Sequence, residues 1–195
     1  MKRVQDIARI LDFIVEVEKL KAVLRKTRPV GLTRYENSAE HSWHVCLAAL
    51  MLKDFANEAL DIDRVIRMLL IHDLGEIDAG DQIVYAGHTA SRYREERAGV
   101  ARVLGMLPEE QAAEYLALWE EFEAGETPES RYARAIDRVP PLLHNLHGGG
   151  HSWKENGISR EQVMALNSRI ALGSEALWQV LRERLEQAAD DGLLT

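Results

Sequence analysis

Apolar residues recur at helical spacing along nearly the whole of this 195-residue chain. Residues three and four positions apart lie on one face of a helix, so this pattern is typical of amphipathic helices. No stretch shows the alternation of apolar and polar residues that indicates a half-buried strand. The first segment predicts a helix over about residues 5–25, whose apolar face consists of Ile7, Ile10, Leu11, Ile14, Val17, Leu20 and Leu24. We therefore expect an all-α fold.

Capping residues and helix breakers divide the rest of the chain. Ser38 is expected to cap a helix that runs to Phe55, and Asp61 is expected to cap the next one. Pro140 and Pro141 should kink or restart a helix, because proline cannot donate to the helical hydrogen-bond ladder. The segments 75–87 and 147–157 are predicted to be loops. The remaining helices are predicted over about residues 61–72, 89–106, 109–123, from 128 past Asp137, and 159–187.

Length and charge exclude several classes of protein. With 46% apolar and 29% charged residues, the chain is expected to form one compact domain over residues 1–195. A net charge of -8 argues against a nucleic-acid partner. No apolar stretch approaches the roughly 20 residues of a membrane span, and the N-terminus lacks an apolar signal region. We therefore expect a cytoplasmic protein with no membrane partner. The single cysteine, Cys46, has apolar neighbours and is predicted to be a core residue.

His72 and Asp73 end the apolar run 68–71, and Glu76 follows about one helical turn later. Buried carboxylates are usually paired or bound to a metal. His41 lies one predicted helix upstream and Asp137 lies further downstream, so the four side chains could form one site. Two imidazoles with two carboxylates are typical ligands of borderline divalent ions, whereas typical Ca and Mg sites are ligated by oxygen alone. We expect one divalent ion, with its identity open among Mn, Co, Fe, Ni, Zn and Mg.

Each of these residues also has an ordinary structural interpretation. A single histidine on an apolar helix face is more often a hydrogen-bonded core residue, and an aspartate at a helix end is often a cap. His44 shares a face with His41, so we expect it to support the site rather than to bind the ion. His144 is expected to be a surface residue or part of a polar network. Spacing alone leaves these alternatives open.

Three short motifs carry a family resemblance. Glu40-His41, the run from His72 to Glu76, and the run 135–138 around Asp137 together resemble the HD-domain metal-dependent phosphohydrolases. The longer blocks 34–44 and 72–81 resemble the 5'-deoxynucleotidase (YfbR-like) branch of that superfamily. The resemblance covers about residues 7–180, which is almost the whole chain.

The resemblance implies a helical bundle around one divalent ion held by His41, His72, Asp73 and Asp137. It implies that Glu76 positions or activates the attacking water, a role that suits a carboxylate near the ligands. It also implies that Asp81 lies on the substrate side, near the sugar hydroxyl. The arginine that contacts the 5'-phosphate in the branch matches Arg25 here. The planar guanidinium of arginine can bind phosphate through two parallel hydrogen bonds.

The phosphate-binding segment departs from the branch pattern at one position. A tryptophan follows the arginine in the 5'-deoxynucleotidases, whereas Lys26 stands here, and the loop is longer by about one residue. Arg34 adds another cation to this loop and is a candidate substrate contact. The phosphomonoester chemistry is therefore a firmer expectation than the preference for deoxynucleosides.

The leading hypothesis is a 5'-nucleotidase that hydrolyses (deoxy)nucleoside 5'-monophosphates to nucleoside and phosphate. A phosphodiesterase or a nucleoside triphosphate hydrolase on the same scaffold is an alternative, and it would gain weight if His88 joined a second metal. A non-catalytic nucleotide-binding module is the third hypothesis. The apolar faces of the first and last helices are typical of a homodimer or of a core, because obligate interfaces resemble a core cut in half.

Overall fold

The computed structural model describes residues 2–87 and 89–194. Throughout these ranges the regular structure is helical, apart from one isolated bridge between Leu24 and Asn37. The predicted all-α class is confirmed. The α-helices are α1 (Lys2–Val17), α2 (Ser38–Leu52), α3 (Ile62–Ile71), α4 (Glu76–Ala79), α5 (Ala90–Leu104), α6 (Glu109–Ala124), α7 (Pro128–Asp137), α8 (Val139–His147), α9 (His151–Asn156), α10 (Arg160–Asn167) and α11 (Glu175–Asp190), joined by short 3-10 segments at Glu18–Ala22, Lys53–Phe55, Val84–Ala86 and Ser168–Leu172.

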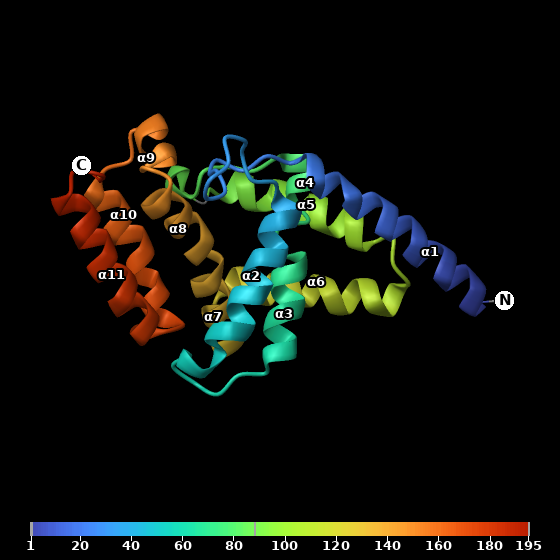
Figure 1. Ribbon diagram of the computed structural model, residues 1–195. Coiled ribbons are helices and arrows are strands. Elements are labelled where there is room, and N and C mark those ends of the chain that lie inside the picture. The colour runs from blue at the N-terminus through green and yellow to red at the C-terminus, as the bar shows by residue number, and fades with distance from the viewer. Residues whose placement is uncertain (1, 88, 195) are drawn as a thin grey trace.

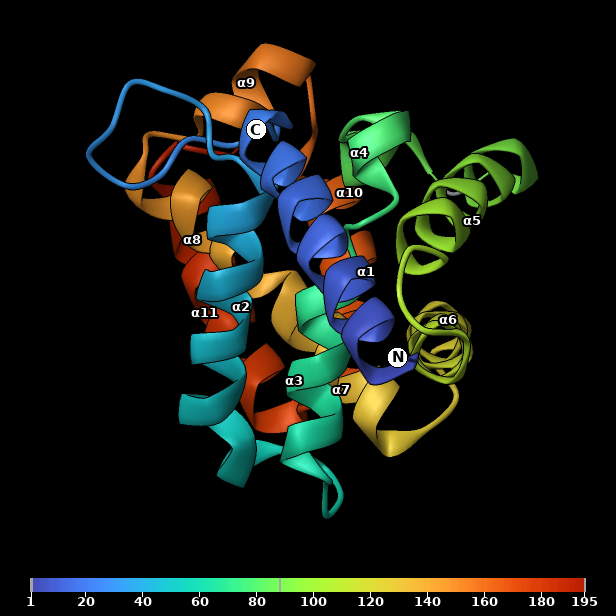
Figure 2. The same cartoon turned by 90° about the vertical axis from the view of Figure 1, so that its right-hand side faces the viewer.

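Helices α2, α3 and α7 form the centre of the bundle. Figure 1 shows α10 and α11 side by side at one end of the molecule and α1, α5 and α6 at the other. In the perpendicular view, α2 and α3 again run side by side (Figure 2). None of the helices in the described part of the chain is long and apolar enough to cross a membrane.

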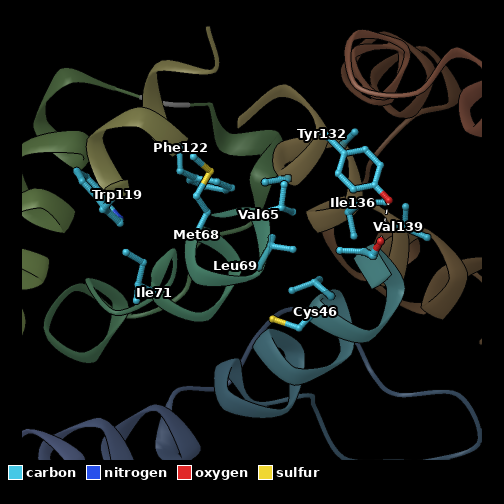
Figure 3. Close-up of a cluster of buried hydrophobic side chains, with 14 of the residues drawn as sticks. Cys46, Val65, Met68, Leu69, Ile71, Trp119, Phe122, Tyr132, Ile136 and Val139 are labelled. Carbon is cyan, nitrogen blue, oxygen red and sulfur yellow. Dashed lines mark hydrogen bonds between the residues drawn. The ribbon is translucent and has the colours of Figure 1, made fainter. Parts of the chain in front are cut away.

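The apolar core lies between these central helices and α6. Met68 and Leu69 of α3 are completely buried, as are Tyr132 and Ile136 of α7. Figure 3 shows them converging with Cys46 of α2, whose predicted place in the core is confirmed. Burying such a side chain stabilises the fold by about 1.5–3 kcal/mol. The buried residues of α3 therefore hold this helix firmly in its place in the bundle.

Helix α2 begins differently from the prediction. Asn37, not Ser38, is the N-cap, because its side chain accepts from the backbone N–H of Glu40 and the Glu40 carboxylate accepts from that of Asn37. This reciprocal pair leaves the Ser38 hydroxyl free for another contact. The predicted cap at Asp61 is confirmed, since its side chain accepts from the N–H of Arg64.

Several predicted boundaries were wrong. The first α-helix ends at Val17 and continues as a 3-10 turn, and the second ends at Leu52, before Phe55. The predicted loop 75–87 contains α4, and the loop 147–157 contains α9. The predicted last helix is two helices, α10 and α11. The helix restart predicted at Pro140 and Pro141 is confirmed, because α8 begins at Val139 with these prolines in its first turn.

Gly173 explains the break between α10 and α11. A Cβ atom there would lie 2.6 Å from the carbonyl oxygen of Arg131 and 2.7 Å from the Cα of Tyr132. The chain therefore passes directly against the backbone of α7 before Ser174 caps α11. This tertiary contact overrides the helical periodicity.

The apolar face of α1 is only partly covered. Ile7, Leu11 and Ile14 are 53%, 57% and 51% exposed. The homodimer expected from this helix stays a prediction.

A close approach between two glycines fixes α4 against α5. A Cβ atom on Gly99 would lie 2.8 Å from the carbonyl oxygen of Gly75, and one on Gly75 would lie 2.6 Å from that of Glu96. Real Cβ atoms do not come this close to backbone, so neither position accepts a side chain without displacement. The start of α4 therefore depends on these two glycines.

Gly99→Ala is expected to destabilise the protein by about 1–2 kcal/mol in urea unfolding, since overpacking costs about 1–3 kcal/mol. Helix propensity alone predicts the opposite sign, a gain of about 1 kcal/mol. Ala98 is exposed on the same helix, so Ala98→Gly measures the propensity effect by itself. A Gly99→Ala protein more stable than the wild type would contradict the close approach.

Candidate metal centre and active site

The C-terminal end of α3 delivers His72 and Asp73 to the site. The apolar residues of α3 are buried in the core, and the chain then turns through residues 72–75 into α4. The Asp73 carbonyl accepts from the N–H of Glu76 at 2.9 Å, which closes this turn. Trp119 donates to the His72 carbonyl at 3.0 Å and holds the turn from α6. The apolar run therefore positions the polar residues that follow it.

The structure brings together the four predicted ligands from α2, the end of α3 and the end of α7. His41 Nε2 lies 2.9 Å from Asp137 Oδ1 and 3.9 Å from Asp73 Oδ2. His72 Nε2 lies 3.1 Å from Asp73 Oδ1 and 3.3 Å from Asp137 Oδ1. Ligand atoms bound about 2.1 Å from one ion lie roughly 3–3.5 Å apart, so this spacing fits a metal-binding set. That these residues bind a metal stays a prediction.

The histidine ring orientations also fit this set. His72 Nδ1 donates to the Leu69 carbonyl at 2.8 Å, so in the neutral ring that a bound metal requires, the lone pair of Nε2 would face the carboxylates. This Nε2 is buried without a hydrogen bond to any described residue. His41 Nδ1 lies 3.6 Å from Glu36 Oε2 on the far side of its ring. A carboxylate in that place orients a ligating histidine.

Crowded carboxylates dominate the electrostatics of the site. Burial opposes ionisation of Asp137, but the adjacent His41 and His72 rings hold its pKa well below the usual range. Burial also opposes protonation of His72, yet Asp73 and Asp137 raise its pKa to about 9. Burial first, and then Asp73, raise the pKa of Glu76 well above its ordinary value. A divalent cation would relieve this concentration of negative charge.

Glu76 begins α4 and lines the same cavity as His72, Asp73 and Asp137. Its Oε2 accepts a hydrogen bond of 2.6 Å from the Ser38 hydroxyl. Ser38 was predicted to be a helix cap, and its contact with Glu76 was not predicted from the sequence. One carboxylate oxygen of Glu76 is thereby oriented by α2.

Arg25 reaches the site, and Arg34 does not. Arg25 Nη1 donates to Asp73 Oδ2 at 2.7 Å and lies 3.8 Å from Asp81 Oδ1. Arg34 instead pairs with Glu40 on the exposed surface, outside the lining of the cavity. The structure therefore does not bring Arg34 to the cavity, and its predicted contact with the substrate stays a prediction.

A second cavity adjoins the first on the side of α8. Both are lined by Arg25, Asp81, Asp137 and Arg138. The second is also lined by residues outside the predicted site, namely Lys26, Thr27, Tyr85, Leu142, Asn145 and Asn167. Arg138 was missed as a candidate, although its position directly after Asp137 could have indicated it.

A polar layer lies behind His41. His144 Nε2 lies 3.8 Å from Glu36 Oε1, and its Nδ1 lies 3.2 Å from the Thr27 hydroxyl oxygen. The ring of His44 lies 6.1 Å from that of His144. This placement agrees with the polar network expected for His144. His88, the candidate ligand for a second metal, lies outside the described residues.

The chain matches a known protein family and is similar to a solved structure. The HD domain family model matches residues 17–178. A solved structure, a predicted metal-dependent phosphohydrolase from Magnetospirillum magnetotacticum MS-1, is 46% identical with a TM-score of 0.91, and the match covers 97% of this chain and 98% of that one.

Several curated relatives carry the name 5'-deoxynucleotidase HDDC2. The protein of Homo sapiens is 28% identical over 137 residues, which are 69% of this chain and 65% of that protein. The protein of Xenopus laevis is 30% identical over 142 residues, 70% of this chain and 68% of that protein. The chain thus spans just under two thirds of the length of the human relative.

Proposed function

This chain belongs to the HD-domain family, and on that premise we propose that it hydrolyses nucleoside 5'-monophosphates, 2'-deoxy ones above all, with one divalent ion. The observation that carries the proposal is the convergence of His41, His72, Asp73 and Asp137 beside Glu76. The names of the curated relatives and of the 46% identical structure support the same chemistry.

The four convergent residues would hold the ion. When bound, such an ion polarises a phosphoryl oxygen and promotes the ionisation of water. The carboxylates of Asp73 and Asp137 supply the negative charge, and the orientation of His72 is maintained by its hydrogen bond to Leu69. The ion identity stays open among Mn, Co, Fe, Ni, Zn and Mg.

Glu76 is the proposed general base. Ser38 holds its Oε2, so Oε1 is the oxygen that can accept a proton from the attacking water. Burial and Asp73 raise the pKa of this carboxyl, and a divalent ion bound beside it would lower that pKa toward the range that a general base needs. Burial keeps the carboxylate in one orientation toward the cavity.

Arg25 and Asp81 form the proposed substrate side of the cavity. Arg25 is committed to Asp73 through Nη1 and retains further N–H donors for a phosphate oxygen. Asp81 lies next to Arg25 and lines both cavities, which suits a contact with the sugar hydroxyl. Lys26 lies in the second cavity, where the branch has a tryptophan, so base or sugar selectivity is expected to differ.

Phosphate release from a panel of substrates tests this function. Metal-stripped protein is resupplied with each candidate ion and offered ribo- and deoxynucleoside 5'-monophosphates, nucleoside triphosphates and cyclic dinucleotides. We expect metal-restored release from monophosphates only, with deoxy substrates preferred. Turnover of diesters or triphosphates instead would favour the alternative hydrolases, and nucleotide binding without turnover would favour the binding module.

A further inference from the structure

Arg138 lies at the junction of the two cavities. It follows Asp137 at the point where α7 ends and α8 begins, and its side chain lines both cavities. Its Nη1 is buried and has no hydrogen-bond partner among the described residues. A buried donor left unsatisfied costs free energy, so this position is suited to a ligand that completes it.

The other arginines that line the first cavity are already committed. Arg92 donates to Glu96 and to two backbone carbonyls. Arg134 donates to two backbone carbonyls at the end of α6. Arg25 donates to Asp73. Among the described arginines that line this cavity, Arg138 therefore has a buried nitrogen that can donate a hydrogen bond to a bound ligand.

The charges around the cavity define what that group must be. The wall formed by Asp73, Glu76 and Asp137 repels anions until a cation is bound, whereas Arg138, which lines the same cavity, attracts them. A phosphoryl group presents several oxygens and can contact an ion through one and a guanidinium through others. A neutral nucleoside would leave the charge of Arg138 unpaired.

We propose that Arg138 is a substrate-binding residue that holds the phosphoryl group of the monoester at the junction of the two cavities. This inference deepens the proposed function and rests on it for the identity of the substrate. Because Arg138 and Asp137 line the same cavity, a phosphoryl group bound there can face both the guanidinium and the proposed ion. Phosphate at this junction would leave the second cavity to the rest of the nucleotide.

Binding of inorganic phosphate to the full chain tests the inference without turnover. Calorimetry on metal-loaded wild type, Arg138→Gln and Arg138→Lys gives the dissociation constants. We expect Arg138→Gln to weaken phosphate binding by about tenfold or more, as the loss of a charged hydrogen bond does, and Arg138→Lys to restore part of it. Arg97→Gln removes one exposed positive charge that pairs with Glu120, and it should leave the affinity unchanged.

Thermal unfolding separates ligand binding from a structural role. An arginine that awaits a ligand contributes little to the phosphate-free protein, so Arg138→Gln should melt no lower than the wild type there. Added phosphate should then raise the melting temperature of the wild type more than that of the variant. An Arg138→Gln protein that fails to fold or melts markedly lower without phosphate would assign Arg138 a structural role and overturn the inference. Unchanged phosphate affinity in a folded variant would also overturn it.

Failure of the proposed function would look different. If the wild type binds phosphate through Arg138 but hydrolyses no nucleoside monophosphate, the substrate is wrong and the anion site stands. If the wild type hydrolyses monophosphates but Arg138→Gln binds phosphate normally, the function stands and the role of Arg138 is wrong. If the wild type binds no phosphate with any candidate ion, the inference about Arg138 is wrong whatever the activity.

Discussion

A Glu76→Gln protein is expected to retain its divalent ion and to release phosphate about 10²–10⁴-fold more slowly than the wild type. Glutamine keeps the size of the side chain and can still bond to Ser38, but it cannot take a proton from water at neutral pH. General-base catalysis typically contributes a factor of this size. Initial rates on a deoxynucleoside 5'-monophosphate, together with metal content by elemental analysis, measure both properties in one preparation. Glu76→Ala should behave in the same way.

Asp78→Asn is the matched control for Glu76. Asp78 lies two residues further along α4 but is exposed and pairs with Arg102 at 2.6 Å, away from the cavity. Loss of its charge should leave turnover within about twofold of the wild type, as expected for an exposed ion pair. Turnover by Glu76→Gln at the wild-type rate would remove Glu76 from the mechanism.

An Asp73→Ala protein is expected to lose both the ion and the activity. Asp73 contributes oxygens to both histidines of the cluster and also pairs with Arg25, so its removal eliminates one ligand and frees a neighbouring cation. A ligand that binds only the folded state stabilises it by about 4 kcal/mol at a thousand times its dissociation constant. The wild type should therefore melt at higher temperature when the ion is added, and Asp73→Ala should show no such shift.

Asp81→Asn distinguishes a ligand from a neighbouring acid. Asp81 lines the same cavity and lies 3.8 Å from Arg25, but it is not one of the four convergent residues. Its variant should keep the metal-dependent rise in melting temperature even if substrate binding weakens. A full thermal shift in Asp73→Ala, or its loss in Asp81→Asn, would mean that the ligand set has been assigned incorrectly.

Local periodicity predicted most of the helices because most of them bury an apolar face, and the partly exposed α1 still carries such a face in its sequence. It failed where backbone contacts between distant segments decide the outcome. The continuous pattern over 159–187 gave no sign that Gly173 would press against α7 and split the helix. The acidic segment after Asp73 contains the short helix α4, whose start lies in close contact with α5 at Gly75.

The candidate ligands could be predicted because a histidine and a carboxylate at the end of an apolar helix are unusual, and because the family motif names the other two. The surrounding contacts could not be predicted from the chain alone. Arg34 was predicted at the substrate, yet Glu40 pairs with it outside the cavity. Ser38 and Arg138 acquire their places only when α2, α4 and α7 come together.

The most direct test of a one-metal phosphohydrolase is titration of the metal-free protein with Mn²⁺ or Co²⁺ while phosphate release from a deoxynucleoside 5'-monophosphate is followed. Release should be absent at the start, rise in proportion to added ion, and level off at one ion per chain. A plateau at two ions would contradict the single-ion site. Phosphate release that does not depend on the added ion, or no release with any candidate ion, would contradict metal-dependent hydrolysis by this site.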